Sequence, residues 1–300
     1  MEGEFTHERR GHNDDAKLFA IPVVDMLQFQ NIKTKAVLYL RRLLGANGIF
    51  VSSNVNKQNL REFFNLIKPT STNKDLIRIG SDGDGGYLIP NDIENVDACF
   101  SPGVSSNSDF EFELANKGVP CYMADYSVEK PPLAHPLFNF QRKFLGSKSD
   151  DVFITLDDWV AEEAAKKREL ILQMDIEGAE YEVILAAKKE TLKQFRILVI
   201  EFHDMEYLLS RVGYKLILES FKKILTDFEI VHLHPNNIMR DKSLQFEEYE
   251  IPSAIEITFL RKDRILSKAP NKNFPHQLDK RNSEYFDDYI LPECWYQVGR

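Results

Sequence analysis

Two hydrophobic rhythms alternate along the chain from Leu76 onward. Short apolar runs predict buried strands, and segments with apolar residues at every third or fourth position predict amphipathic helices. The predicted strands are 96–103, 119–127, 169–175, 195–203, 228–235 and 254–262, with a short strand and then a helix within 151–167. The other predicted helices are 107–118, 177–189 and 205–225. This alternation predicts a doubly wound, mostly parallel α/β sheet with helices on both faces, and the last two strands predict an antiparallel hairpin at one edge.

The two ends of the chain differ from this middle part. Residues 1–16 lack apolar periodicity, which predicts a disordered tail, and 17–70 has a mostly helical pattern. Within it, KTKAVLYLRRLLG (33–45) has a basic and an apolar face, so it either lies on a membrane surface or packs on the main domain or a second subunit. Residues 71–265 hold the strand–helix alternation. The segment 266–300 is rich in proline and asparagine, which predicts a loop-like extension over the active-site face.

Composition narrows the class of protein. Hydrophobic residues make up 43% of the chain, yet no run approaches the roughly 18 apolar residues of a membrane helix. No charged-then-apolar leader is present, so we expect a cytoplasmic protein. The formal net charge of −9 argues against a nucleic-acid partner. Cys99, Cys121 and Cys294 have neither metal-ligand spacing nor an even-numbered framework, so we expect reduced, structural cysteines.

The ends of the first two predicted strands have the features of a nucleoside site, because ligands bind outside the carboxyl ends of parallel strands. The first ends in SPGVSSN, where Gly103 permits a tight turn and the helix near Asn107 offers free N–H groups. The second ends on Asp125, a carboxylate placed to accept ribose hydroxyls. The fingerprint G-x-G-x-x-G is absent, which disfavours NAD and favours a cofactor without pyrophosphate, such as S-adenosylmethionine. The alternative is an ordinary strand–turn–helix with a capping aspartate.

The segment RIGSDGDGGYLIP precedes the first of these strands. A calcium loop is excluded, because the fifth and twelfth positions counted from Asp82 are Gly86 and Ile93 rather than oxygen ligands. A glycine-rich turn between Arg78 and Tyr87 instead lets a ligand approach the backbone closely. A plain hairpin turn is the alternative.

Acidic residues and a histidine follow two neighbouring strands of the predicted sheet. Asp175 ends one strand, and Glu201 and His203 end the next. Side chains that converge there can hold a hard divalent cation or position a substrate hydroxyl. Glu177 and Glu180 also suit the positive N-terminal end of the following helix, which explains them without any chemistry.

The strand 228–235 is followed by an asparagine-rich loop. By strand alternation, His232 and His234 project from the same face. Asn236 and Asn237 follow, and their amides are suited to a polyhydroxylated ligand. The alternative is a pair of half-buried histidines before an asparagine-rich turn.

The segment LILQMDIEGAEYEVIL, followed by LVIEFHD, resembles the hallmark of the FkbM-type methyltransferases, which are class I S-adenosylmethionine enzymes. RIGSDGDGGYLIP, FSPGVSSNSDFEFELANKG and YMADYS fall where the cofactor-binding half of that family lies. VHLHPNN, IPSAIEITFLRKD and FPHQLDKRN are similar to the C-terminal pattern of a bacterial branch. The resemblance covers about 78–282. It implies a Rossmann-like, seven-stranded methyltransferase fold and O-methylation of a sugar or related hydroxyl compound, often a capsule or surface-glycan precursor.

The residue patterns and the resemblance together give three groups of candidate site residues, and the resemblance itself implies the roles of Gly103, Asp125, Asp175, Glu201 and His203. The cofactor-binding candidates are Arg78, Gly85, Gly86, Tyr87, Gly103, Asp109 and Asp125. Asp175, Glu201 and His203 face the transferred methyl, with Asp175 and Glu201 as ligands for Mg or Mn. The acceptor-binding candidates are His232, Asn236 and Asn237, and either His203 or His234 removes the proton of the acceptor hydroxyl. The first motif, SPGVSSNSDFE, lacks the aspartate and second glycine usual in these enzymes.

Two other functions stay open at this point. One is a nucleotide-sugar dehydrogenase or epimerase on a Rossmann fold, which the missing glycines disfavour. The other is a non-catalytic glycan-binding or scaffold protein, which the altered first motif favours. We expect a small-molecule or glycan acceptor as the partner, and the early helices make a homodimer possible.

Overall fold

The computed structural model describes residues 37, 39, 53–164 and 167–297 of the chain. The chain divides into two compact units, Met1–Ser52 and Ser53–Arg300. In the first unit, Val37 and Tyr39 are helical with exposed side chains. The predicted tail and most of the predicted N-terminal helical region lie outside the described residues. The sheet and the candidate site both belong to the second unit.

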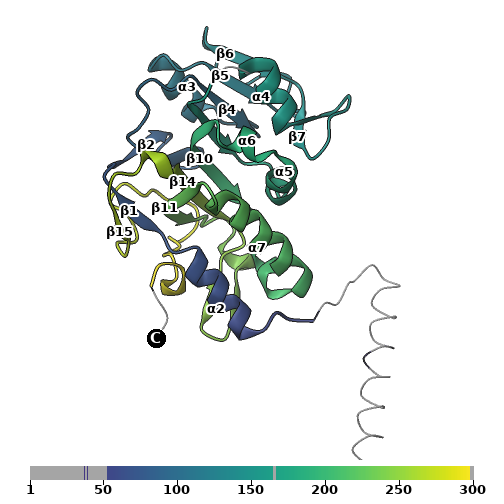
Figure 1. Cartoon of the computed structure of the whole chain (residues 1–300), viewed down its shortest axis with the longest axis vertical. Coiled ribbons are helices and arrows are strands. Elements are labelled where there is room, and N and C mark those ends of the chain that lie inside the picture. The colour runs from purple at the N-terminus through teal and green to yellow at the C-terminus, as the bar shows by residue number, and fades with distance from the viewer. Residues whose placement is uncertain (1–36, 38, 40–52, 165–166, 298–300) are drawn as a thin grey trace, which may run out of the picture. The chain divides into compact units, whose positions relative to one another are not determined.

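A seven-stranded sheet forms the centre of the second unit, with strand order β11-β14-β10-β9-β4-β5-β6 (Figure 1). Its strands are β4 (Ala98–Pro102), β5 (Cys121–Ala124), β6 (Phe138–Gln141), β9 (Leu170–Met174), β10 (Phe195–Phe202), β11 (Phe228–Pro235) and β14 (Ile255–Arg261). The strands from β6 to β10 pair in parallel, whereas β14 runs antiparallel to both β10 and β11. The predicted doubly wound, mostly parallel sheet is confirmed.

One detail of the predicted sheet is wrong. The short strand expected within 151–167 is β8 (Phe153–Thr155), which pairs with β7 (Phe144–Gly146) outside the central sheet. The edge position belongs to β6, whose partly exposed residues Phe-Asn-Phe-Gln give only a weak strand pattern. The predicted antiparallel pair is confirmed, because β11 and β14 pair antiparallel at the other edge of the sheet, with β11 as the edge strand and β14 next to β10.

The remaining elements surround this sheet. The helices are α2 (Lys57–Leu66), α3 (Asp109–Asn116), α4 (Leu156–Ala164), α5 (Glu180–Ala186), α6 (Lys189–Leu192) and α7 (Arg211–Leu225), and the short strands are β1 (Thr70–Thr72), β2 (Leu76–Gly80), β3 (Gly86–Pro90), β12 (Leu244–Phe246), β13 (Tyr249–Ile251) and β15 (Lys268–Pro270). The predicted helix 205–225 is interrupted, because Ser210 accepts a hydrogen bond from the backbone N–H of Gly213 and caps α7 after a short 3-10 helix. Within the described residues, no helix is long and apolar enough to cross a bilayer.

The two faces of the sheet pack against different partners. On one face, apolar strand residues such as Leu172 and Ile257 form a core with α2, α4, α5 and α7. On the other face, Ile171 and Val199 pack against α3 and the hairpin of β2 and β3. Because successive side chains along a strand alternate between faces, each central strand contributes to both cores. Cys99 and Cys121 are buried and free, which agrees with their predicted structural role.

Toward the carboxyl ends of the strands, the hairpin face becomes polar. Gln173 is the register partner of Val199, Glu201 is the partner of Glu256, and Glu256 is also the partner of His234. Residues that are directly opposite on neighbouring strands project from the same face of a sheet. These four polar side chains therefore form a row that crosses the sheet on the side covered by the hairpin.

The C-terminal segment after β15 folds over the carboxyl end of β11 and the neighbouring amino end of β14. Nε2 of His232 lies 2.8 Å from Oδ1 of Asp279. The amide of Asn282 donates to Glu256 over 2.6 Å, and the side chain of Asn237 exchanges hydrogen bonds with the backbone of the same segment. The segment thus covers one end of the polar row.

We expect Gly103→Ala to lower the free energy of unfolding by about 2–4 kcal/mol, because two penalties add. The φ angle of Gly103 is 90°, and a Cβ there would meet the carbonyl oxygen of Asp175 at 1.6 Å. Gly118→Ala is the matched control: its φ is 88°, but no atom lies within 4 Å of the added Cβ. The control should lose only about 1 kcal/mol. Urea unfolding measures both, and equal losses would contradict the close packing of Gly103 on Asp175.

Candidate functional site

Two cavities open at the carboxyl ends of β4, β5 and β9. The larger has a volume of about 450 Å³, and the smaller, which we call the acidic cavity, has a volume of about 120 Å³. Both are lined by Gly103, Ser105, Asp175 and Glu177, so the two cavities meet at these residues. Because Gly103 has no side chain, the turn after β4 packs directly against the backbone of Asp175 at this junction.

Asp125 joins the loops that follow β4 and β5. Its Oδ2 accepts a hydrogen bond from the backbone N–H of Ser105 (2.8 Å), and its Oδ1 accepts from the N–H and the hydroxyl of Ser127 (2.7 and 2.6 Å). The side chain is buried and lines the larger cavity together with the rings of Phe144 and Phe153. A carboxylate beside an apolar wall is what a nucleoside requires, since the ribose supplies donors and the base an apolar surface.

The glycine-rich turn closes the hairpin of β2 and β3. The guanidinium of Arg78 donates to two carbonyl oxygens of the turn, each over 2.8 Å, and so fixes its shape. Gly85 and Tyr87 line the acidic cavity, whereas Arg78, Gly86 and Asp109 line neither cavity. The structure therefore brings two of these five predicted cofactor contacts to a cavity.

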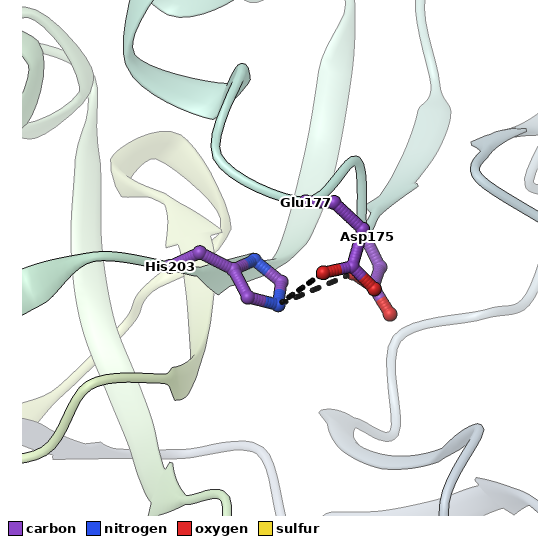
Figure 2. Close-up of side chains that lie close together, drawn as sticks. All are labelled: Asp175, Glu177 and His203. Carbon is purple, nitrogen blue, oxygen red and sulfur yellow. Dashed lines mark ion pairs between the residues drawn. The ribbon is translucent and has the colours of Figure 1, made fainter. Parts of the chain in front are cut away.

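Asp175, Glu177 and His203 converge beside the acidic cavity (Figure 2). Nε2 of His203 lies 3.8 Å from Oδ1 of Asp175 and 3.6 Å from Oε2 of Glu177. One ligand atom from each residue lies within 4.8 Å of the other two. Glu201, the second predicted metal ligand, also approaches, with its Oε1 3.8 Å from Nε2 of His203. Carboxylate oxygens and an imidazole nitrogen at these separations can coordinate a divalent cation.

Glu180 orients the imidazole of this cluster. Its buried Oε1 lies 3.2 Å from Nδ1 of His203 and accepts hydrogen bonds from the backbone N–H groups of Ile176 (3.2 Å) and Gly178 (3.1 Å). This contact favours a proton on Nδ1 and leaves Nε2 facing the carboxylates of the cluster. The acidic residues between Asp175 and Glu180 therefore have two different roles. Asp175 faces the cavity, whereas Glu180 stabilises the loop and orients His203.

Burial and like charges shift the pKa values in this cluster. Burial, reinforced by the charge of Glu201, raises the pKa of Asp175 to about 8. Burial, reinforced by the charge of Glu256, raises the pKa of Glu201 to about 8. Burial alone would lower the pKa of His203, but the hydrogen bond with Glu180 and the charge of Glu201 raise it to about 9. Strongly displaced pKa values of this kind are typical of functional sites.

The predicted acceptor residues divide into two groups. Asn236 donates to Oε1 of Glu201 over 2.7 Å, and His234 lies in the polar row. Burial lowers the pKa of His234, and its buried Nε2 has no hydrogen-bond partner among the residues that the structure describes. By contrast, His232 and Asn237 make their hydrogen bonds to the C-terminal segment, so they hold that segment over the sheet.

Strained backbone occurs in the loops around the two cavities. Ser105, Glu177 and Asp204 have positive φ angles of 42°, 55° and 53°, although none is a glycine. They lie after β4, β9 and β10 respectively. Such conformations cost on the order of 1–3 kcal/mol each and concentrate where function requires them.

Four residues of the site were not assigned to it from the sequence. Glu177 fits the N-terminal end of a helix, yet its side chain joins the cluster around His203. Gln173 and Glu256 are polar residues that interrupt otherwise apolar strand sequences. A polar residue in a buried strand indicates a functional role, so the sequence did contain a signal for both. Glu111 lies within α3, where the buried face depends on packing that the sequence alone does not determine.

Comparison with known proteins finds a family model that matches part of the chain. Residues 103–228 match the family described as the methyltransferase FkbM domain. This confirms the resemblance over a narrower range than predicted and over less than half of the chain, and it supports an S-adenosylmethionine-dependent methyltransferase. The matched range holds the nucleoside-side residues and the cluster around His203, whereas Glu256, His234 and the C-terminal segment lie outside it. No curated protein matches the chain.

Two solved structures are similar to the chain. The crystal structure of a fibrillarin/NOP5P complex has 14% identity and a TM-score of 0.34, with 55% of this chain and 72% of that chain covered. The Methanococcus jannaschii fibrillarin pre-rRNA processing protein has 10% identity and a TM-score of 0.31, with 63% and 83% covered. The α/β fold described above follows from the strand order of the seven-stranded sheet.

We expect Glu256→Gln to gain stability relative to the wild type by about 4 kcal/mol more at pH 9 than at pH 5. Burial raises the pKa of Glu256 from its ordinary value of 4.5 to about 8. The folded protein therefore keeps a proton that the unfolded chain releases, and this contribution is full below pH 4.5 and lost as the pH rises through 8. Glutamine has the same shape and cannot ionise. Urea unfolding at both pH values is the measurement, and parallel pH profiles would contradict a neutral Glu256.

Proposed function

We propose that the protein is an S-adenosylmethionine-dependent O-methyltransferase whose acceptor is a sugar or a related hydroxyl compound. The observation that carries the proposal is the junction of the two cavities at Asp175, next to Nε2 of His203. Methyl transfer needs a sulfonium, a methyl carbon and an acceptor oxygen in line, together with one group that manages a proton. The match to the methyltransferase FkbM domain supports this reaction class.

The larger cavity is suited to the nucleoside of the cofactor. Phe144 and Phe153 supply an apolar surface for the base, and Asp125 supplies acceptors for the ribose hydroxyls. Gly103 separates this cavity from the acidic one without a side chain, so a bound molecule can pass close to the backbone there. The sulfonium then lies near Asp175, with the amino-acid part of the cofactor beyond it.

Asp175 is the group that we assign to the acceptor proton. With a pKa of about 8, Asp175 becomes an ionised base as the pH rises toward 8, whereas His203, with a pKa of about 9, still holds its proton there. The acceptor oxygen attacks the methyl carbon, the carbon–sulfur bond breaks, and the hydroxyl proton passes to Asp175. The imidazolium of His203 stabilises the ionised carboxylate before the transfer.

Divalent cation binding is the second way in which the same cluster can act. The residues that fit a cation are Asp175, Glu177 and Nε2 of His203, and the buried Oδ1 of Asp175 has no hydrogen-bond partner in the described part of the chain. A bound cation would lower the pKa of the acceptor hydroxyl. Glu201 lies next to these three residues. Its carboxyl group is held in place by a hydrogen bond from the amide of Asn236.

The polar row favours a neutral, hydroxyl-rich acceptor. Glu201 and Glu256, each with a pKa of about 8, are largely protonated at pH 7, so each both donates and accepts hydrogen bonds. His234 is two strands away from Glu201, on the order of 10 Å at the usual strand spacing. That distance suits a contact to the far side of a sugar ring better than proton transfer from the reacting hydroxyl.

We expect Asp125→Asn to weaken binding of S-adenosylhomocysteine by about tenfold or more, because the ribose loses a charged acceptor. Titration calorimetry at pH 7.5 is the measurement. Asp97→Asn is the matched control, since Oδ2 of Asp97 also accepts two backbone N–H bonds, but at the amino end of β4. Micromolar binding by wild type and control, with loss in Asp125→Asn, supports the proposal. No binding by the wild-type protein would sink it and favour the non-catalytic scaffold.

We expect Mn²⁺ to bind the wild-type protein and Glu177→Gln to weaken that binding by about tenfold or more. Glu182→Gln is the control, because Glu182 is an exposed residue of α5 outside the cluster. Calorimetric titration with MnCl₂, in the presence of S-adenosylhomocysteine, measures the affinity. If the wild type showed no saturable heat of Mn²⁺ binding, the role of a cation would be excluded. Proton transfer to Asp175 would then be the mechanism that remains.

A further inference from the structure

The lining of the acidic cavity has an unusual charge composition. Asp84, Glu111, Asp175 and Glu177 contribute four carboxyl groups, and no lysine, arginine or histidine lines the cavity among the described residues. With a volume of about 120 Å³ it is too small for a nucleoside. Its chemistry therefore favours a small group that carries a positive charge.

Glu111 differs from the other three carboxyl groups. Asp175 and Glu177 face the imidazole of His203, whereas Glu111 has no cationic partner within the described residues. It is 3% exposed, at the start of α3, and its carboxyl contacts the hydroxyl of Ser101 at the end of β4. Burial raises the pKa of Glu111 to about 7, so a nearby cation would readily ionise it.

A hydrogen-bond network accommodates both protonation states of Glu111. The hydroxyl of Ser101 lies within hydrogen-bond distance of both Glu111 and Oε1 of Gln173, and Nε2 of Gln173 lies 3.2 Å from the hydroxyl of Tyr87. One hydroxyl proton serves only one acceptor, so this arrangement requires a proton on Glu111. If the Gln173 amide turns over, it donates to Ser101, Ser101 donates to an ionised Glu111, and Tyr87 donates to Gln173. In each state, the hydroxyl of Ser101 donates one hydrogen bond and accepts one within this network.

We propose that Glu111 binds the ammonium group of the amino-acid moiety of the cofactor and releases a proton when the cofactor binds. The inference rests on the proposed function and deepens it. The larger cavity takes the nucleoside, the sulfur lies at the junction by Asp175, and the ammonium group enters the acidic cavity. The protonated carboxyl gives its proton to solvent, and the resulting carboxylate pairs with the ammonium. Glu111 is thus a binding residue and leaves the methyl transfer itself to Asp175.

The surroundings of Glu111 do not supply an internal cation in place of the ligand. Arg78, on β2, is bound to the carbonyl oxygens of the hairpin turn. The titratable groups nearest Glu111 on the surrounding elements are Asp84 and Tyr87 of the hairpin, Cys99 and Cys121 of β4 and β5, Asp175 and Glu177 after β9, and Asp109 and Glu113 of α3. None of these groups can carry a positive charge, and the charge of Asp109 raises the pKa of Glu111 further, so a cationic partner has to come from a ligand.

The test compares two ligands and two variants by titration calorimetry at pH 6, 7 and 8. S-adenosylhomocysteine carries the ammonium group, and methylthioadenosine has the same nucleoside without it. Glu111→Gln keeps the size and hydrogen bonds of the side chain but cannot ionise. Glu113→Gln is the control on the same helix, because Glu113 accepts from the backbone N–H of Gly80 and does not line the cavity. Titration in buffers of different ionisation enthalpy counts the protons released.

We expect the wild type and Glu113→Gln to bind S-adenosylhomocysteine more tightly at pH 8 than at pH 6, with release of a proton near pH 6. Glu111→Gln should bind it about tenfold or more weakly at pH 8, without that pH dependence, and should bind methylthioadenosine like the wild type. Unchanged affinity and pH dependence for S-adenosylhomocysteine in Glu111→Gln would overturn the inference while leaving the proposed function intact. Equal losses for both ligands would also overturn it, since the ammonium would not be what Glu111 recognises. Failure of the wild type to bind either ligand would overturn both proposals.

Discussion

The alternation of side chains along the central strands is the constraint on which the rest of the site depends. One face of the sheet stays apolar to the strand ends and packs under α2, α4, α5 and α7. On the other face, the same alternation brings Gln173, Glu201 and Glu256 into line beneath the hairpin of β2 and β3. A shift of one residue in the register of a strand would turn these carboxyl groups into the large core.

Burial then gives these carboxyl groups their chemical character. In water each would be an ordinary anion, but under the hairpin and the C-terminal segment Asp175, Glu201 and Glu256 keep their protons up to about pH 8. Glu180 has a different task, because its carboxylate oxygen contacts two backbone N–H groups and His203 and so holds the loop and the imidazole in place. One acidic stretch therefore contains both a group that organises the loop and a group that can take up a proton.

The sequence revealed the parts of the fold that have a strong local signal. The runs that became β4, β5, β9, β10, β11 and β14 are apolar and bounded by turns, and all were predicted. The strand β6 was missed because it lies at the sheet edge, where only part of each residue is buried. The place of β14 between β10 and β11 depends on long-range pairing, which the local pattern does not encode.

The site was predictable to a similar degree. Asp175, Glu201 and His203 end neighbouring parallel strands, so their convergence followed from the order of the strands alone. Glu111 reaches the acidic cavity from a helix, and the contacts of Asn237 involve a segment about 46 residues further along the chain. Both depend on how distant elements pack, and for that reason they became visible only in three dimensions.

The most direct test of the central claim is a crystal structure of the complete protein with S-adenosylhomocysteine. We predict that the adenine lies against Phe144 and Phe153, that the ribose contacts Asp125, and that the sulfur lies at the junction beside Asp175 and Gly103. A ligand bound away from this junction, or with its sulfur directed away from Asp175, would contradict the assignment of methyl transfer to this site.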